Sequence, residues 1–404
     1  APASPLAACT SRGWQQVALP PAIAAQSLAV DGAAGRQRLY AAMYRTDGGS
    51  VQADHAVWAI QLDALTLQPL SAFDAATKAV RAIAVRPDSG LLAAGLSAGG
   101  VVHAAPDGAL GAVGLDRRLV TAVEAGAATT YAAATDLASD AAAGLEAGHA
   151  VVWRQQADGA WQPLAADDDP FGSGYFWDLA LDGAGRLWAS KDGDGIWALD
   201  GAATAAPGRW RPVGDAELRG RTVQAVAVDP VDTSFVYAGL RPSVTRPASD
   251  VAGRFGLRQS RDGGTTWTGY PDGQTSAAPG TPFRDLAVPA VATGPAGGWV
   301  WASAWGLGLF VSRDAGGRWH RLSLPPSPTA PGVRIAPYVD GLATARIDGA
   351  CDLVFATGQA GVFARSIADV AAEIEHAIYL PATLGAPWDI LWPKPDATAA
   401  AAGR

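Results

Sequence analysis

The feature that most constrains the fold of this chain is a repeat. Seven times along the sequence, a short run of alternating apolar residues ends in a turn rich in Gly and Asp. Such self-similarity is typical of folds built from repeated supersecondary units. We expect the first strand of each unit to begin near these residues: Ser27, Arg81, Leu119, Trp177, Gln224, Arg284 and Asp340.

Each unit continues with further short strands of regular composition. The second strand places a large apolar residue before small ones, as in Leu39–Ala42 and Leu187–Ser190. The third strand is equally regular, as in Val57–Ile60 and Gly195–Trp197. Large residues followed by small ones suit tapering sheets that pack face to face around a central axis. The sequence therefore predicts an all-β fold, a seven-bladed β-propeller of four-stranded blades.

The two ends of the repeat array predict how the ring closes. Six units carry a fourth strand, but none follows Phe363 and Arg365 in the seventh. An apolar strand from Trp14 to Leu19 precedes the first unit and has no local partner. We expect this N-terminal strand to complete the last blade. The chain would then consist of a lead, 1–13, a propeller, 14–365, and a C-terminal helix and extended tail, 366–404.

Cys9 and Cys351 are the two cysteines of the chain and lie near opposite ends of it. In an up-and-down blade the second and fourth strands start on the same face, so both sulfur atoms should lie there. We expect a disulfide between them, formed in an oxidising compartment; the alternative is two free buried thiols. The opening Ala1-Pro2-Ala3-Ser4 lacks an initiator Met and suggests a processed N-terminus. We therefore expect a secreted, extracellular or cell-surface protein.

Two segments, 260–267 and 312–319, match the pattern Ser-x-Asp-x-Gly-x-x-Trp. They resemble the Asp-box (BNR-type) repeats of sialidases, sortilin-like receptors and the photosystem II assembly factor family. The resemblance implies a structural motif at the outer rim, in which the Asp accepts backbone N–H bonds in a turn, the Gly takes a positive φ and the Trp packs on the blade. The residues with these implied structural roles are Asp262, Trp267, Asp314 and Trp319.

The catalytic parts that a sialidase would need are missing. The closest string to its Phe/Tyr-Arg-Ile-Pro signature is Phe283-Arg284-Asp285-Leu286, which is not a match. Asp178 and Asp285 align at the start of two inner strands, and two carboxylates across a channel mouth are what an inverting glycosidase uses. The alternative is that they solvate the channel or cap strand ends. We expect a protein that is not an enzyme.

The composition also restricts the possible ligands. The net charge is -8, which does not favour nucleic acid, and no apolar run is long enough for a membrane span. The five His residues are scattered and lack metal-ligand spacing. The acidic runs 167–169 and 192–194 could hold calcium but are typical of solvated turns. We therefore expect no metal and no cofactor.

Two regions remain as candidates for binding. Long connections on one face of the ring carry aromatic and basic side chains, which are Tyr175, Arg241, Tyr270 and Trp305. In the tail, the apolar residues 367, 370, 371, 374 and 378 recur at helical spacing and predict a short helix near 367–377. Beyond that helix the tail is extended and apolar. The side chains expected to need a covering surface there are Tyr379, Leu380, Trp388, Ile390, Leu391 and Trp392.

Three functions compete on these observations. The first is a non-catalytic extracellular structural protein that self-assembles into a homopolymer or filament, with each tail docking on the next subunit. The second is a monomeric or cell-attached propeller whose loop face binds a glycan or an extracellular protein. The third is a glycoside hydrolase that uses Asp178 and Asp285. The sequence leaves all three open.

Overall fold

A computed structural model represents the whole chain, and its described part runs from residue 7 to residue 377. Gaps in the described part are 18, 20–22, 46–56, 63–64, 71–72, 74–78, 107–108, 138–147, 165–170, 205–207, 215–217, 243–254, 270–282, 284–286, 323–338, 348–349 and 359–360. The helical segments are α1 (Ala7–Thr10) and α2 (Ile367–Ala377). All other regular elements are strands.

The strands form seven four-stranded antiparallel sheets, which confirms the predicted propeller. The first three blades consist of β2 (Ile23–Asp31), β3 (Arg38–Arg45), β4 (Val57–Gln61) and β5 (Thr66–Pro69); β6 (Val80–Val85), β7 (Leu92–Leu96), β8 (Val101–Ala104) and β9 (Leu110–Gly114); and β10 (Arg118–Ala125), β11 (Thr130–Asp136), β12 (Ala150–Gln155) and β13 (Trp161–Pro163).

Blades four to six follow the same order. They consist of β14 (Phe176–Leu181), β15 (Leu187–Lys191), β16 (Gly195–Leu199) and β17 (Arg211–Val213); β18 (Thr222–Val228), β19 (Val236–Arg241), β20 (Gly256–Ser260) and β21 (Thr268–Gly269); and β22 (Val291–Thr293), β23 (Val300–Ala304), β24 (Gly308–Ser312) and β25 (His320–Leu322). Blade seven contains β26 (Val339–Ile347), β27 (Cys351–Gly358), β28 (Gly361–Ser366) and β1 (Gln15–Val17).

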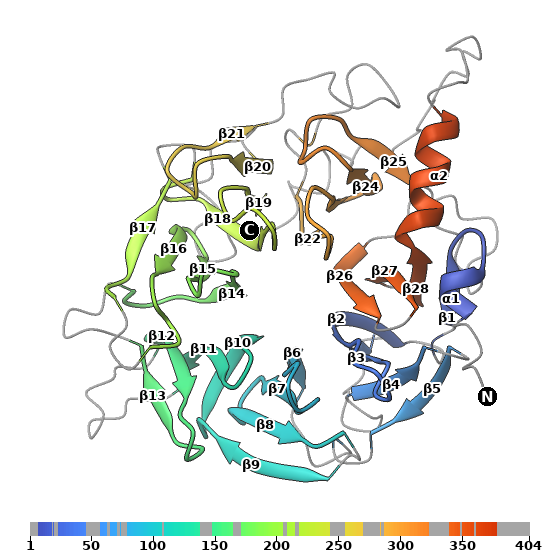
Figure 1. Cartoon of the computed structure of the whole chain (residues 1–404). Coiled ribbons are helices and arrows are strands. Elements are labelled where there is room, and N and C mark those ends of the chain that lie inside the picture. Colours follow the sequence, from blue (N-terminus) through green and yellow to red (C-terminus); the bar gives the residue numbers. More distant parts are fainter. Residues whose placement is uncertain are drawn as a thin grey trace, which may run out of the picture.

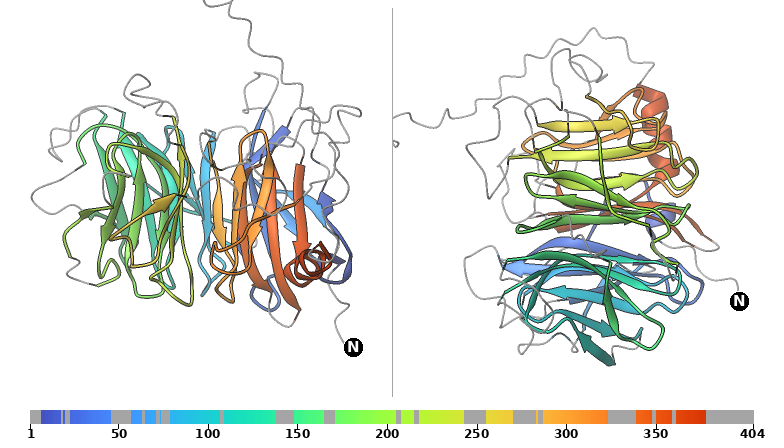
Figure 2. Two further views of the ribbon diagram at one scale, coloured as in Figure 1. Left: turned by 90° about the horizontal axis from the view of Figure 1, so that it is seen from above. Right: turned by 90° about the vertical axis from the view of Figure 1, so that its left-hand side faces the viewer.

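The blades surround a central axis, with the first strand of each blade innermost (Figure 1). Edge-on, the ring is a thick disc whose strands run between its two faces (Figure 2). All inner strands start on one face, which also carries the connections from second to third strands and from blade to blade. We call it the loop face, and the other the opposite face.

The core lies between neighbouring blades. The second strands supply large side chains that are almost completely buried at one repeated position, opposite the inner strand: Tyr40, Tyr131, Trp188, Tyr237, Trp301 and Phe355. Small residues, mostly Ala, flank them and let the next blade approach closely. The pattern of large and small residues seen in the sequence is therefore the pattern of the blade-to-blade contact.

Blade seven closes the ring. β1 pairs antiparallel with β28, from Gln15 opposite Ala364 to Val17 opposite Val362, and thereby supplies the fourth strand that the repeat lacks. The predicted closure by the N-terminal strand is confirmed. A hydrogen bond from the Gly13 amide to the Asp369 carboxylate fixes the entry to β1 against α2.

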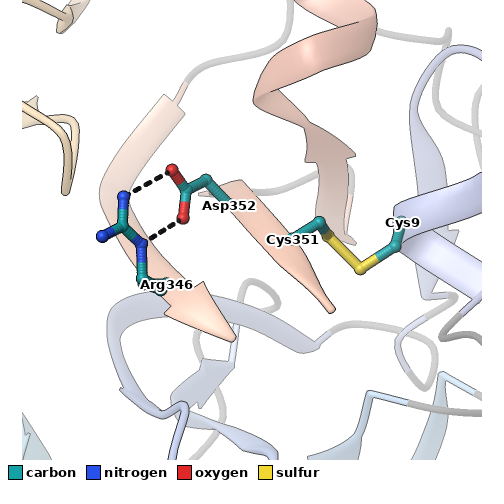
Figure 3. Close-up of a disulfide and its surroundings, with 4 residues drawn as sticks. All are labelled: Cys9, Arg346, Cys351 and Asp352. Carbon is teal, nitrogen blue, oxygen red and sulfur yellow. Dashed lines mark hydrogen bonds and ion pairs between the residues drawn. A yellow bond between two sulfur atoms is a disulfide. The ribbon is translucent and has the colours of Figure 1, made fainter. Parts of the chain in front are cut away.

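A disulfide reinforces this closure. Cys9 in α1 is bonded to Cys351 at the start of β27, with a Cα–Cα distance of 5.8 Å, as the sequence predicts (Figure 3). Beside it, Arg346 makes a two-pronged ion pair with Asp352 across the β26–β27 hairpin, with N–O distances of 2.9 and 3.2 Å. The two ends of the propeller are thus joined by a ladder and by a covalent bond.

The inner strand of blade six differs from the prediction. The expected strand began at Arg284, whereas β22 is Val291–Thr293 and pairs with β23. The segment 284–293 contains two apolar runs, one on each side of Pro289. The second run is next to the turn into β23, so it forms the hairpin. The residue of blade six that is equivalent to Asp178 is therefore Ala290, and Asp285 lies outside the described residues.

Helix α2 covers the outer side of blades six and seven (Figure 1). Its apolar face, formed by Ile367, Val370 and Ile374, is buried at the spacing that the sequence predicts. The carboxylate of Asp369 accepts hydrogen bonds from Arg365 and from the Gly13 amide. The helix is therefore part of the ring wall.

Replacing both Cys9 and Cys351 with serine should lower the midpoint of thermal unfolding. The bridge joins residues 342 apart in sequence, and closing so long a loop in the unfolded chain is worth up to about 5 kcal/mol in the chain-entropy account. Scanning calorimetry of the oxidised protein and the double variant measures the difference. An unchanged midpoint would show that β1 pairing alone closes the ring.

Candidate functional site

A cavity of about 890 Å³ occupies the centre of the ring. Residues from the inner strand of every blade line it. A propeller channel is a concave site on a rigid scaffold, which is where ligands of such folds are held. The channel and its loop-face mouth are therefore the candidate site.

A repeated β-bulge shapes the channel wall. The register slips by one residue near the start of the inner strand in every blade except blade six. A bulge inserts an unpaired residue and re-aims its side chain. The bulged residues all line the channel, and they are Gln26, Arg81, Thr121, Trp177, Gln224 and Asp340.

The residue after the bulge joins neighbouring blades in two places. The Ser27 hydroxyl accepts a hydrogen bond from the Ile83 amide in the next blade, at 3.3 Å. In the same way, Asp178 Oδ2 accepts from the Val226 amide, at 2.9 Å, and its Oδ1 accepts from the Leu179 amide, at 2.9 Å. Asp178 is therefore a bridge between blades four and five.

The surroundings of Asp178 also affect its charge. It lines the channel, where part of its surface is open to the cavity and the rest is enclosed by protein. This burial raises the pKa of Asp178 to about 7, and the hydrogen bonds from Val226 and Leu179 limit the rise because they favour the ionised form.

Two residues beyond Asp178 in the repeat, the wall has a ring of small side chains. In six inner strands this position is Ala: Ala29, Ala84, Ala180, Ala227, Ala292 and Ala343. It faces the large buried residue of the second strand in all of these except blade two, where Ala84 is opposite Ala93. In blade three the residue is Glu124, which stands opposite Tyr131. Burial, and secondarily repulsion by Asp178, raises the pKa of Glu124 to about 8.

A preformed cluster lies at the mouth between blades four and five. The Arg241 guanidinium stacks on the Trp177 ring at 4.8 Å, and the Trp177 indole N–H donates to Asp192 at 3.3 Å. Asp192 also accepts from the Thr222 hydroxyl at 3.0 Å. Burial lowers the pKa of Arg241, while the charge of Asp192 opposes this. The interactions hold the indole in one orientation beside the channel.

The structure places the residues predicted for the loop face in different surroundings. Tyr175 is 37% exposed at the channel mouth, and Trp305 is 51% exposed in the turn between β23 and β24. Arg241 is half-buried against Trp177 and is not freely available. Tyr270 and Asp285 lie outside the described residues, as does the extended tail with Tyr379, Leu380, Trp388, Ile390, Leu391 and Trp392.

Metal ligands do not gather in the described part of the chain, where no group of three His, Cys, Asp or Glu side chains could hold an ion. Asp192 and Asp194, the acidic turn considered for calcium, instead accept hydrogen bonds from Trp177 and Trp197. The other acidic run, 167–169, is outside the described residues. No described helix is long and apolar enough to cross a membrane.

Sequence reasoning missed Trp177, Arg81 and Glu124 as channel residues. Trp177 and Arg81 were recognised as strand starts, but the bulge that turns them into the channel leaves no mark in the apolar alternation. Glu124, in contrast, could have been recognised from the sequence. Aligning the inner strands by their apolar residues places it in a column of Ala.

No family model and no curated protein matches the chain. Solved structures are similar in fold: the extracellular domain of a hybrid two-component system from B. thetaiotaomicron has 9% identity and a TM-score of 0.58 over 88% of this chain. The GH74 xyloglucanase from Xanthomonas campestris has 17% identity and a TM-score of 0.57 over 89%. YCF48 from Cyanidioschyzon merolae has 14% identity and a TM-score of 0.53 over 87%.

These neighbours differ in extent and in role. The chain covers 40% of the length of that extracellular domain, 54% of the xyloglucanase chain and 98% of the YCF48 chain. They include an extracellular domain and a glycoside hydrolase, and YCF48 also has a structure bound to a D1 peptide. At these identities the likeness shows the propeller fold.

We expect Asp178 to contribute to the stability of the fold through its two backbone hydrogen bonds. Asp178→Ala leaves the Val226 and Leu179 amides without their acceptor, which should lower the free energy of unfolding by about 1–3 kcal/mol. Asp178→Asn keeps one oxygen acceptor and should be milder. Chemical denaturation of both variants measures this. Equal stability of the Ala variant and the wild type would remove the bridging role.

Proposed function

We propose that this protein is a non-catalytic extracellular propeller that binds a glycan or a protein at its loop face. The distribution of exposed apolar side chains carries the proposal. Of the described large apolar residues that are exposed, Leu137, Tyr175 and Trp305 lie on the loop face, and Val231 lies on the opposite face. Exposed aromatic side chains on a rigid scaffold are typical of recognition surfaces.

The wall of the mouth adds to this argument. Trp177 is held by Arg241 and Asp192 next to exposed Tyr175, so its side chain is already fixed before a partner binds. Preorganised side chains lose less entropy when a partner arrives. The structural neighbours that act on xyloglucan or bind the D1 peptide support a polar polymer as the partner, either glycan or peptide.

A binding role also fits the chemistry of Asp178 better than hydrolysis does. The carboxylate accepts two backbone hydrogen bonds, and the equivalent residue in blade six is Ala290, which has no carboxyl group. An inverting glycosidase needs two opposed carboxyl groups with room for water between them. We propose that the channel performs no hydrolysis, and that the Cys9–Cys351 bridge reflects an oxidising location outside the cytoplasm.

We assign the turns 260–267 and 312–319 to Asp-box repeats with a structural role. In each turn the Asp carboxylate accepts from a backbone amide four residues later, Thr266 at 2.9 Å and Arg318 at 2.8 Å. Each Ser hydroxyl accepts from the motif glycine amide at 2.8 Å. Trp267 and Trp319 are buried between blades. These turns connect third and fourth strands on the opposite face, away from the proposed binding surface.

Removal of the loop-face aromatic residues should abolish binding. We expect Tyr175→Ala with Trp305→Ala to lose glycan-array or extracellular protein-array signals given by the wild type, because their aromatic surface is lost, with no loss of thermal stability. Val231→Ala on the opposite face, where Val231 is 71% exposed, is the matched control. Loss of the signals in the control, or no signal from the wild type on either array, would refute the proposal.

Self-assembly through the tail is a second candidate, favoured by the attachment of α2. The helix is fixed to the ring by ion pairs of Arg365 with Asp369 and Glu373, both at 2.6 Å, and of Arg313 with Glu375, at 2.9 Å. The apolar sequence of 378–404 therefore follows a firmly held helix on the outer wall. Apolar side chains of that size can drive association when buried on an identical neighbour.

The tail candidate is tested by a truncation after Ala377. Ending the chain at Ser366 instead would also remove the buried face of α2, so the cut has to follow the helix. We expect full-length protein to form larger species in sedimentation velocity and filaments in electron micrographs, and the truncated protein to stay monomeric. Full-length protein that is monomeric at high concentration would contradict this candidate.

A further inference from the structure

Glu124 is an exception to the internal repeat of the channel wall. At the equivalent position each of the other inner strands has Ala, whose methyl group is all that the blade packing there requires. A carboxyl group in that place lines the channel and is enclosed on its other sides by the surrounding blades, and this partial burial disfavours its ionised form. Nothing in the closure of the ring or in the packing of blade three calls for an acid there.

The charged and titratable groups around Glu124 are few in the part of the chain that the structure describes. Strand β14 of the next blade contributes Asp178, and β6 of the preceding blade contributes Arg81. In its own blade, Tyr131 on β11 is opposite, with Arg154 of β12 beyond it. Strand β7, which also packs on β10, has no titratable side chain.

The rest of the channel balances in charge. Arg81 is exposed to the cavity and makes no ion pair with any described residue. Asp340, which accepts a hydrogen bond from the Tyr44 hydroxyl at 3.4 Å, is the other described charged group in the lining apart from Glu124 and Asp178. Burial raises the pKa of Asp340 above its usual value as well. Where Asp340 is ionised it offsets Arg81, and the net charge of the cavity then depends on Glu124 and Asp178.

We propose that the channel is nearly neutral in mildly acidic solution and becomes negative as the pH rises through neutrality, with Glu124 and Asp178 as the groups that release protons. The consequence is a channel that concentrates small organic cations, such as amines and guanidinium groups, in neutral to alkaline solution and loses this preference in acid. Walls of low dielectric constant focus the field of charges in a narrow channel, which strengthens the effect. The proposal does not depend on what binds at the loop face.

The direction of the titration supports the proposal. Burial raises the pKa of Glu124 to about 8 and that of Asp178 to about 7, so both change charge between mildly acidic and mildly alkaline solution. Each carboxylate disfavours ionisation of the other, so their protons are released in coupled steps.

Carbon-13 NMR of the protein labelled at glutamate side-chain carboxyl carbons tests the titration. The chain has five Glu residues, so the spectrum is simple. One resonance should titrate with a midpoint near 8, be absent from Glu124→Gln, and move to a lower midpoint in Asp178→Asn, which removes the neighbouring charge while keeping an oxygen acceptor. Five ordinary titrations below pH 6, or no shift in Asp178→Asn, would overturn the proposal.

Relaxation by charged nitroxides tests the consequence and requires no specific ligand. The broadening of the Thr121 and Ile83 methyl signals, which report from the channel, is compared for 4-trimethylammonium-TEMPO, whose positive charge does not titrate, and 4-carboxy-TEMPO at pH 5.5 and pH 9. We expect the ratio of cation to anion broadening to rise several-fold with pH, to rise much less in Glu124→Gln, and to change little at Val231 outside the channel. If the ratio of cation to anion broadening at the channel methyl groups changes with pH only as much as the ratio at Val231, the proposed change in channel charge is refuted.

Protein stability provides a separate check with a defined sign. An acid whose pKa is higher in the folded chain than in the unfolded one binds its proton more tightly when folded, so stability falls as pH rises, here from about the ordinary glutamate value of 4.5 to about 8. Glu124→Ala, which copies the other blades, should therefore raise the unfolding midpoint more at pH 9 than at pH 5. An equal change at both pH values would contradict the buried titration.

Discussion

Closure of the ring is the constraint on which the rest of the structure depends. A blade of this fold cannot bury both faces alone, because each large second-strand side chain packs on the small residues of the neighbouring blade. The seventh blade therefore has to contact the first, and the chain provides for this with the β1–β28 ladder and the Cys9–Cys351 bond. A closed ring fixes the channel wall, and the bulges then determine which side chains enter it.

The inner wall contains residues that stabilise the ring and one residue, Glu124, that destabilises it as the pH rises. Ser27 and Asp178 bridge adjacent blades through backbone amides, and the column of Ala residues lets blades converge near the axis. Glu124 stands in that column in place of Ala, and because it is partly buried there it binds a proton more tightly than an exposed Glu would. A destabilising residue in an otherwise repeated scaffold is expected at a position with a functional role. The loop face, in contrast, carries the exposed aromatic residues on which the proposed binding function rests.

The fold was predictable because its signal is repeated. Second strands, closure by the N-terminal strand, the disulfide and α2 all followed from local patterns, such as the unpaired strand near Gln15 and the helical spacing of Ile367, Val370 and Ile374. The predicted inner strand of blade six was wrong because two apolar runs lie on either side of Pro289. The pattern of a single strand cannot decide which of the two runs pairs with the next strand. The site was predicted only in part, since a bulge changes the direction of a side chain such as Trp177 without changing the hydrophobic pattern.

We propose that the loop face, and not the outer wall or the tail, meets the partner. Hydroxyl-radical footprinting of Trp and Tyr side chains tests it most directly, comparing purified protein with protein in the material from which it is isolated. We expect slower oxidation of Tyr175 and Trp305 in that material, and the same rate of oxidation of Trp388 and Trp392 in both samples. Protection of Trp388 and Trp392 with full reactivity of Tyr175 and Trp305 would contradict it and place the contact in the tail.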